Sequence, residues 1–255
     1  KGYGCGGSTA TAYGVVCQEL EAIDSGLRSL VSVQGSLAMF AIYRWGSEEQ
    51  RTQWLPAMAT GDVIGCFGLT EPDFGSNPSG MRTTARRDGS DWILNGSKMW
   101  ITNGTVADVA VVMAKTDPDA GHRGITAFLV PTDTEGFTAE KIDNKLGIRA
   151  SDLAELRLED VQIPAENVIG EENEGFYQLM DFFASGRTSV AAQAVGAAQG
   201  ALDAAREYAS EREQFDQPIA EFQAIKHKLA EMATNVEAAR SLTYRAASAV
   251  ESGDD

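Results

Sequence analysis

Three residues near position 70 combine a hydroxyl at the end of a strand with a tight turn just beyond it. In GCFGLTEPDFGSN, residues 65–77, an apolar run of strand length ends at Thr70, and Gly75 and Ser76 follow. A threonine hydroxyl can donate a hydrogen bond to a ring nitrogen, and the N–H groups and hydroxyl of a Gly-Ser turn can bind a phosphate. These residue types and their spacing suit a flat heteroaromatic cofactor that carries a pyrophosphate.

Other common nucleotide and metal signatures do not fit the sequence. No G-x-G-x-x-G lies between a strand and a helix, and G-x-x-x-x-G-K-[ST] is absent, which argues against Rossmann and P-loop nucleotide sites. The only histidines, His122 and His227, form no close cluster with cysteines and acids, so no metal site is expected. The segment MWITNG, residues 99–104, adds an indole for packing on an aromatic ring and a second threonine.

The elements that must position these residues change type twice along the chain. Residues 1–62 carry apolar residues at helical spacing, and residues 164–255 return to long helical patterns. Between them, residues 63–163 contain alternating or apolar runs that are punctuated by Asp-Gly and Asn-Gly pairs, which is typical of hairpins in an antiparallel sheet. The sequence therefore predicts an α+β multidomain protein with an N-terminal helical domain, a middle antiparallel β domain and a C-terminal helical bundle.

Local signals refine some of the boundaries. Ser47 followed by Gln50 is a capping-box sequence that predicts the start of a helix. Pro56 suits the first turn of a further short helix. The Asn-Gly pair at residues 95–96 predicts a hairpin turn.

Charge and cysteine content narrow the class of protein. Thirty-seven acidic residues against 21 basic ones give a net charge of −16, which argues against nucleic-acid binding and indicates a salt-adapted, halophilic surface. An ordinary acidic cytosolic protein is the alternative.

No apolar run is long enough for a membrane span. Cys5, Cys17 and Cys66 are widely spaced and odd in number, which favours a reducing, cytoplasmic location.

Four motifs resemble the acyl-CoA dehydrogenase family in the family's order and spacing across essentially the whole chain. They are GLTEPDFGSN, NGSKMWITNG, KLGIRAS, and REQF followed by FQAIKHKLAEM. The resemblance implies a flavoenzyme, usually a homotetramer, with FAD between the β domain and the C-terminal helices. It also implies an acyl-CoA substrate, which loses an α proton and a β hydride, and an electron-transferring flavoprotein as electron acceptor.

The resemblance also assigns cofactor roles residue by residue. Residues expected to line the flavin ring are Phe67, Leu69 and Thr70; Ser76 is expected at an FAD phosphate beside Gly75; Trp100, Ile101 and Thr102 are expected to cover the ring; and Arg212, Phe215 and Gln223 are expected to reach the FAD of a neighbouring subunit. One position departs from the family: Asp216 replaces the usual glycine after Phe215. An acid near a phosphate is unfavourable unless it turns away.

A segment near the N-terminus narrows the range of possible substrates. Arg28 and Ser29 resemble the arginine and serine with which glutaryl-CoA dehydrogenases bind the distal carboxylate of a dicarboxylyl-CoA, and a guanidinium can bind a carboxylate through two parallel hydrogen bonds. Arg187 matches a family arginine near the CoA site, and Ser76 is also expected at the substrate. KLGIRASD, in contrast, resembles short- and branched-chain members, so both substrate classes stay open.

The catalytic base is expected outside the given residues. Most family members use a glutamate far into the C-terminal domain, which would lie beyond Asp255, while a minority place the base at a position that aligns with Gly186. The 255 residues therefore resemble a fragment of a family-length chain. Glu71 or Asp73 is the rival candidate for the base.

Two further functions remain open. A relative of the same fold could use the flavin with oxygen, as an oxidase or monooxygenase. A non-catalytic protein that binds flavin or acyl-CoA is the other alternative.

Overall fold

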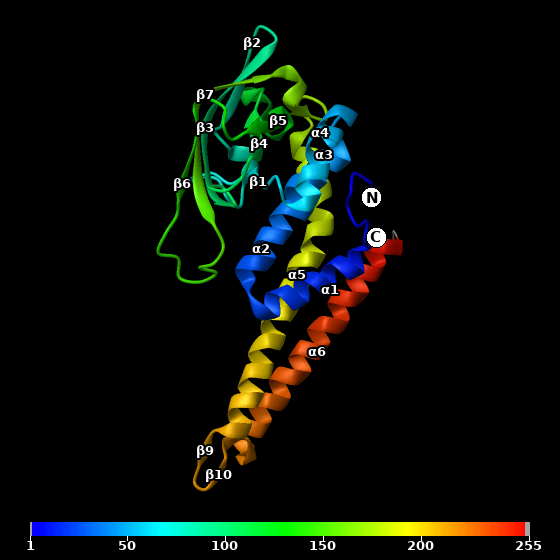
Figure 1. Cartoon of the computed structure of the whole chain (residues 1–255), viewed down its shortest axis with the longest axis vertical. Helices are drawn as coiled ribbons and strands as arrows, with labels where there is room; N and C mark the ends of the chain where they lie inside the picture. The colour runs from blue at the N-terminus through cyan, green and yellow to red at the C-terminus, as the bar shows by residue number, and fades with distance from the viewer. Residues whose placement is uncertain (1, 253–255) are drawn as a thin grey trace. The chain divides into compact units, whose positions relative to one another are not determined.

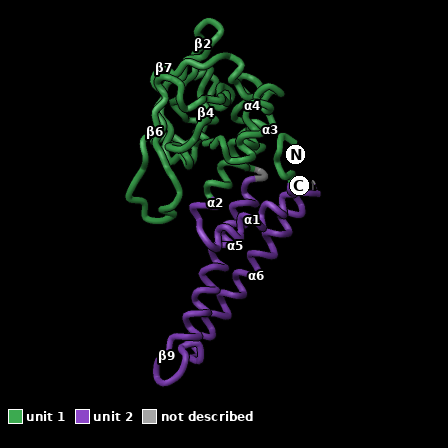
Figure 2. Tube along the Cα trace, viewed as in Figure 1, with its two compact units in different colours: residues 1–7, 29–184 green, residues 8–28, 185–255 purple. Residues whose placement is uncertain are grey.

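A computed structural model describes residues 2–252 and leaves undescribed the side chains of residues 184 and 185. It divides into two compact units (Figure 2). Unit 1 comprises residues 1–7 and 29–184, and unit 2 comprises residues 8–28 and 185–255. Each unit is described by itself below. Within the described residues, no helix combines the length and the apolar character needed to cross a bilayer.

The helices of unit 1 precede and follow its sheet along the chain (Figure 1). They are the end of α2 (Ser25–Ser32), a π-helical turn (Val33–Ala38), α3 (Met39–Trp45), α4 (Glu48–Thr60) and the start of α5 (Gly175–Glu211). The predicted start of α4 is confirmed, because Ser47 and Gln50 form a reciprocal capping box. The predicted break at Pro56 is wrong: α4 continues through Pro56 to Thr60.

The middle of the chain forms one eight-stranded sheet in unit 1. Its order is β6-β7-β3-β2-β4-β5-β8, and β1 also pairs with β4. The strands are β1 (Gly65–Gly68), β2 (Thr84–Asp88), β3 (Asp91–Thr102), β4 (Val109–Lys115), β5 (Ile125–Pro131), β6 (Phe137–Lys141), β7 (Leu153–Pro164) and β8 (Val168–Ile169). The predicted antiparallel β domain is confirmed, with two parallel pairings, β1 with β4 and β2 with β4, that hairpin signals do not predict.

The core of unit 1 lies on both faces of the sheet. Ala110 and Val112 of β4 belong to a cluster that contains Trp92 and Leu156. Val111, between them in the sequence, belongs instead to a cluster with residues of α3 and α4. Successive side chains of a strand point to opposite faces, so a strand that is buried on both faces must be apolar throughout. This explains the continuous apolar run of β4, whose first six residues are all buried.

Unit 2 is a helical assembly of α1 (Ala10–Ile23), the later part of α5 and α6 (Gln223–Ser252), with a two-stranded hairpin of β9 (Glu213–Gln214) and β10 (Gln217–Pro218). A Cβ added to Gly200 of α5 would lie 2.7 Å from the carbonyl oxygen of Ala22, so α1 and α5 approach at backbone distance. The N–H of Thr11 donates to Glu251 Oε1 at 2.6 Å, which connects α1 to the end of α6. The long C-terminal helices expected from the sequence are therefore present.

Candidate functional site

The sequence-predicted hydroxyl of Thr70 lies two residues beyond the end of β1 in unit 1. Its side chain is half-buried, and its carbonyl accepts a hydrogen bond from the N–H of Met99 at 2.8 Å. Glu71 and Phe74 then close a turn through two backbone hydrogen bonds of 3.1 and 3.2 Å. The sequence positions Thr70 because short, buried β1 pairs in parallel with β4, and the chain must leave the sheet where β1 ends.

Gly75 and Ser76 follow this turn and are exposed. A Cβ added to Gly75 would lie 3.8 Å from Cγ2 of Thr70, so Gly75 lies close to Thr70 at the end of β1. Among residues 2–252, the hydroxyls of Thr70, Ser76 and Thr102 have no protein hydrogen-bond partner within bonding distance. The hydroxyls of Thr70 and Ser76, near the end of β1, and that of Thr102, at the end of β3, are therefore available to an external acceptor.

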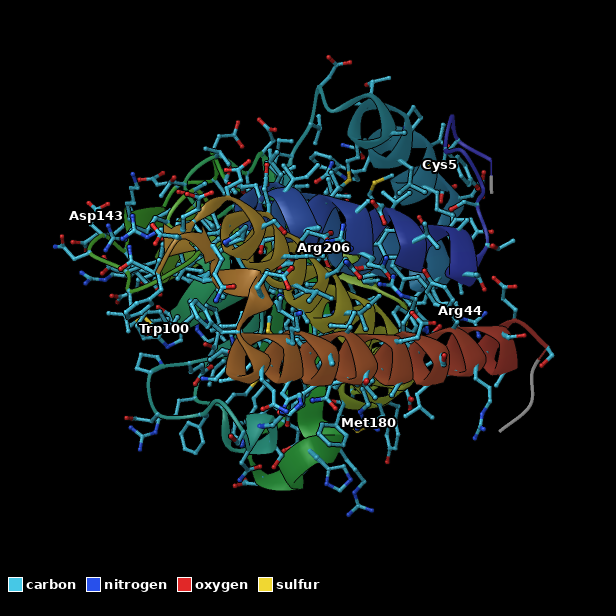
Figure 3. The ribbon with its side chains drawn as sticks, turned by 90° about the horizontal axis from the view of Figure 1, so that it is seen from below. Cys5, Arg44, Trp100, Asp143, Met180 and Arg206 are labelled. Atoms are coloured by element: carbon cyan, nitrogen blue, oxygen red, sulfur yellow. The ribbon has the colours of Figure 1, made fainter. Side chains whose placement is uncertain are left out.

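The predicted segment Trp100–Thr102 forms the end of β3, where the strand is irregular. The pairing of β3 with β7 shifts between Lys98 and Ile101, and Trp100 has a φ of 63°. Positive φ is rare for a large aromatic residue and, when observed, marks strain that often accompanies function. The bulge turns the indole outward, where Trp100 is 58% exposed (Figure 3). Ile101, by contrast, is buried in the sheet core, so only its backbone is available to a ligand.

Phe67 and Leu69 lie on the face of the sheet that the helices of unit 1 cover. Both are partly buried and pack against the cluster that contains Ile42 and Val111. The Phe67 ring is nearly parallel to that of Phe182, with centroids 6.2 Å apart. Their side chains therefore contribute apolar surface beside Thr70.

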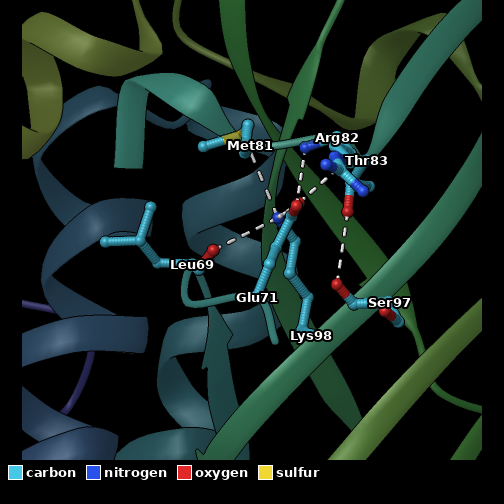
Figure 4. A network of polar contacts seen from close by, with 7 residues as sticks. All are labelled: Leu69, Glu71, Met81, Arg82, Thr83, Ser97 and Lys98. Atoms are coloured by element: carbon cyan, nitrogen blue, oxygen red, sulfur yellow. Dashed lines mark hydrogen bonds and ion pairs between the residues drawn. The ribbon is translucent and has the colours of Figure 1, made fainter. Parts of the chain in front are cut away.

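A buried ion pair lies directly behind this strand end (Figure 4). Lys98 Nζ lies 2.9 Å from Glu71 Oε1, and the two side chains are 0% and 5% exposed. The carboxylate of Glu71 also accepts hydrogen bonds from the N–H groups of Arg82 at 2.6 Å and Thr83 at 2.9 Å. Burial acts to raise the pKa of Glu71, but the Lys98 ammonium and the donors of Thr83 and Arg82 lower it overall. Burial lowers the pKa of Lys98 to about 8, against the opposing effect of Glu71.

The sequence did not single out Lys98, although it lies inside the quoted NGSKMWITNG motif. It also missed Gln34, a buried residue of the π-helical turn. Gln34 Nε2 donates to the carbonyls of Met58 at 3.0 Å and Val63 at 2.8 Å, and its Oε1 accepts from the N–H of Gly65 at 2.7 Å. Gln34 therefore fixes the start of β1. A π-helical turn often marks a functional site, but the sequence contains no pattern that predicts one here.

The residues predicted to contact a neighbouring subunit gather at the β9–β10 end of unit 2. Phe215 is 87% exposed, and its ring makes an edge contact with Phe222 at 6.1 Å between centroids. Arg212 and Gln223 are exposed at the two ends of this hairpin region. Phe215 and Asp216 have φ values of 56° and 59°, so they form a two-residue turn in which both residues are left-handed. Glycine is favoured at the second position of such a turn, which explains why Asp216 is unusual.

The predicted substrate residues are placed on two helices. Arg28 and Ser29 are consecutive in α2, and Arg28 Nε lies 2.7 Å from Oε2 of Glu21, with the two side chains of this pair 12% and 3% exposed. Ser29 is 9% exposed. Arg187 is exposed on α5, one residue after Gly186.

Sequence profiles of one family match most of the chain. The acyl-CoA dehydrogenase N-terminal domain matches residues 1–62, the middle domain matches residues 66–161, and the C-terminal domain matches residues 173–255. The short-chain specific mitochondrial acyl-CoA dehydrogenase of Mus musculus is 45% identical over 236 residues, which cover 92% of this chain and 57% of the mouse protein.

Solved structures give the same result. The crystal structure of glutaryl-CoA dehydrogenase from Mycobacterium smegmatis matches with a TM-score of 0.94 and 52% identity, covering all of this chain and 64% of that one. A structure of a glutaryl-CoA dehydrogenase from the same organism, in complex with FADH2, matches with a TM-score of 0.93 and 52% identity over 98% of this chain and 64% of that one. The chain thus spans about three-fifths of the length of these relatives. It belongs to the acyl-CoA dehydrogenase family.

Proposed function

We propose that this protein binds FAD and dehydrogenates an acyl-CoA thioester, and that its substrate is a short dicarboxylic acyl-CoA such as glutaryl-CoA. The observation that carries the proposal is the hydrogen bond between the N–H of Met99 and the carbonyl of Thr70 in unit 1. It joins the strand end that bears the hydroxyl to the strained segment that presents Trp100. Membership of the family and the FADH2 complex of a 52% identical relative support the cofactor.

The residues present fit a flavin. The unpartnered hydroxyls of Thr70 and Thr102 suit hydrogen bonds to the edge of a heteroaromatic ring, and the exposed indole of Trp100 suits packing on its face. The Gly75–Ser76 turn offers N–H groups and a hydroxyl for a phosphate.

The chemistry that FAD supplies when bound is the acceptance of a hydride. Within this chain, the proposed role of Thr70 is to donate its hydroxyl hydrogen to the ring. Ser76 would hold the phosphate end in place, and Trp100 would shield one face of the ring from water. Together these contacts orient the cofactor, which is the larger part of what a protein contributes to flavin chemistry.

We also propose that the protein is a homo-oligomer, as a tetramer or at least a dimer. The exposed side chains of Arg212, Phe215 and Gln223 support this proposal, because the resemblance expects these residues to reach the FAD of a second subunit. An electron-transferring flavoprotein is the proposed electron acceptor. A cytoplasmic location and a salt-adapted surface remain proposals that rest on three free cysteines and a net charge of −16.

The proposed substrate class rests on Arg28 and Ser29. Glu21 holds the Arg28 guanidinium in a fixed orientation through Nε. A guanidinium has five N–H donors, so a substrate carboxylate would share it with Glu21. Arg187 is the proposed contact for the CoA portion.

We assign no catalytic base among residues 2–252. The carboxylate of Glu71 already accepts three hydrogen bonds, and its lowered pKa makes it a poor proton acceptor. Asp73 is paired with Arg82 at 3.1 Å. Gly186 has no side chain. The rival assignment of the base to Glu71 or Asp73 therefore has no support in their contacts.

An anaerobic titration tests the function. The purified protein is reconstituted with FAD in salt and mixed without oxygen with glutaryl-CoA, butyryl-CoA or isovaleryl-CoA, while the flavin absorbance is followed. We expect FAD to bind and glutaryl-CoA to bleach the flavin most completely. Failure to take up FAD would refute the proposal. Bound FAD that no acyl-CoA reduces would favour the non-catalytic alternative, and rapid reoxidation of reduced flavin by air would favour an oxidase.

Arg28→Ala tests the substrate class. We expect its KM for glutaryl-CoA to rise by a factor that corresponds to about 2 to 4 kcal/mol, because a charged hydrogen bond to a desolvated carboxylate is lost. The KM for butyryl-CoA is the internal control, since it lacks the distal carboxylate and reports any general damage from the loss of the Glu21 partner. Equal increases for both substrates would refute dicarboxylate recognition while leaving the flavin proposal intact.

A further inference from the structure

The buried pair of Lys98 and Glu71 lies where it can control the geometry of the strand end that bears Thr70. Lys98 belongs to β3, and Glu71 directly follows Thr70. Figure 4 shows the Lys98 ammonium in contact with both the Glu71 carboxylate and the carbonyl of Leu69. Lys98 Nζ donates to Leu69 O at 3.3 Å, and the neighbouring N–H of Met99 donates to Thr70 O. Lys98 and Met99, consecutive in β3, therefore bind the carbonyl before Thr70, that of Leu69, and the carbonyl of Thr70 itself.

The carboxylate of Glu71 fixes both ends of the loop that contains the Gly-Ser turn. The loop leaves the strand end at Glu71 itself and returns at Arg82 and Thr83, whose N–H groups donate to that same carboxylate. Lys98 Nζ donates to Oε1 at 2.9 Å, the same oxygen that accepts from the N–H of Thr83. The pair thus connects β3, the strand end and the returning segment before β2 at a single point.

The local sequence makes space for the lysine. A Cβ added to Gly68, the last residue of β1, would lie 3.2 Å from Cγ of Lys98. The aliphatic part of Lys98 therefore passes directly over Gly68 to reach the carboxylate. Met81 Sδ lies 4.0 Å from Nζ on another side, which leaves the ammonium no exposed surface.

A buried ion pair adds little net stability to the contact between two strands. Replacing such a pair by apolar residues of similar volume is often neutral or stabilising, because desolvation offsets the attraction between the charges. The pair does constrain the geometry of the groups that it joins, because an ammonium and a carboxylate satisfy their donors and acceptors only in a narrow set of arrangements. The pair is therefore better suited to fixing the position of backbone groups than to raising stability.

We propose that Lys98 and Glu71 are positioning residues for flavin binding, which hold the Thr70 hydroxyl and the Gly75–Ser76 turn in the arrangement that receives the ring and the phosphate. This inference rests on the proposed function, and neither residue is assigned a contact with the flavin. It extends the site beyond the residues that the sequence motif identified as cofactor contacts.

Titration of the apoprotein with FAD tests the proposal through flavin fluorescence and the visible circular dichroism of the bound flavin. Lys98→Met removes the ammonium but keeps an unbranched side chain. We expect it to weaken FAD binding by about tenfold or more and to change the dichroism, because the Leu69 carbonyl loses its donor and Thr70 shifts. Gly68→Ala displaces the lysine side chain without changing any charge, and we expect a smaller loss in the same direction.

Lys141→Met is the matched control. Lys141 lies on β6 of the same sheet and pairs at 3.5 Å with Asp143, and both side chains are more than half exposed. We expect its FAD affinity and dichroism to equal those of the wild type.

The double variant Glu71→Gln/Lys98→Met keeps the test decisive if Lys98→Met does not fold, because the double variant buries no unpaired charge. We expect it to fold, as judged by far-ultraviolet circular dichroism, and still to bind FAD more weakly with an altered visible spectrum. Wild-type affinity and spectrum in a folded Lys98→Met variant or in the double variant would overturn the positioning role alone. A wild-type protein that binds no FAD would instead overturn the proposed function, and the positioning role with it.

Discussion

Lys98→Met should destabilise unit 1 in a way that depends on pH. The substitution leaves the 5% exposed Glu71 carboxylate with two neutral N–H donors and no cation. Breaking a buried ion pair by removing one partner costs about 3 to 5 kcal/mol. For a chain of this size that free energy corresponds to a fall in Tm of roughly 6 to 20 °C.

The pH dependence follows from the pKa of Glu71. In the wild type this pKa is lowered, so the stabilising contribution of Glu71 is present above its ordinary pKa and is lost only below it. In Lys98→Met the largest remaining effect is burial, which acts to raise the pKa of Glu71 against the donors of Thr83 and Arg82, and we expect burial to prevail once the ammonium is removed. The folded variant then binds a proton before the unfolded chain does. Its stability deficit should therefore shrink as the pH falls from about 7.5 to about 5.

Tryptophan fluorescence during urea unfolding, at a fixed salt concentration and at both pH values, measures this deficit. All four tryptophans, Trp45, Trp54, Trp92 and Trp100, lie in unit 1, so the signal reports that unit. The control Lys141→Met removes an exposed ion pair and should change the free energy of unfolding by less than about 1 kcal/mol at either pH. A deficit in Lys98→Met that is no larger than in this control, or that is the same at both pH values, would refute the reasoning.

Three further predictions concern other features. Gln34→Leu should cost about 2 to 5 kcal/mol in urea unfolding, because it leaves the Gly65 N–H and the Val63 carbonyl without their side-chain partner and leaves the Met58 carbonyl only the N–H of Gly61; a loss below about 1 kcal/mol would contradict this. Asp216→Gly should raise the thermal stability of unit 2 by about 1 kcal/mol by relieving a left-handed turn residue, and no gain by circular dichroism would argue against strain there. The Tm should rise from low salt to molar KCl, because salt screens the repulsion between like charges at a net charge of −16. A Tm that stays flat or falls would contradict the proposed salt adaptation of the surface.

Much of the fold is predictable because the decisive signals are local. The capping box of Ser47 and Gln50 uses two side chains three residues apart, and the structure contains both of its hydrogen bonds. The continuous apolar run of β4 follows from burial on both faces. The Asp-Gly pair at residues 88–89 leads directly from β2 into β3, as a hairpin requires.

The failures occur where tertiary contacts override a local signal. The Asn-Gly pair at residues 95–96 forms no turn: β3 runs through it, with a register shift at Gly96, whose φ is 151°. The Asn95 side chain exchanges two hydrogen bonds of 2.9 Å with Asp160 across the sheet, so the pair makes a bulge. Pro56 likewise remains inside α4 because Leu55 and Met58 are buried on either side of it.

The residues of the candidate site also differ in whether local sequence or tertiary contacts reveal them. Its hydroxyls and its indole are recognisable by type and order, so the sequence alone suffices to propose Thr70, Ser76 and Trp100 as cofactor contacts. Lys98 and Gln34 act through burial and through partners more than 20 residues away. A lysine in a strand is normally a solvated charge, and nothing in its neighbours indicates that it has no exposed surface.

The contact between α1 and the end of α6 has a consequence for synthesis on the ribosome. Thr11 and Glu251 are 240 residues apart, and at a rate of 5 to 20 residues per second the later partner follows the earlier one by roughly 10 to 50 s. Until α6 has been synthesised, α1 cannot form this contact, although Cys17 of α1 is 1% exposed in the folded protein. α1 is therefore packed late relative to its own synthesis, and its apolar side chains and the thiol of Cys17 remain open to chaperones and oxidants in the meantime.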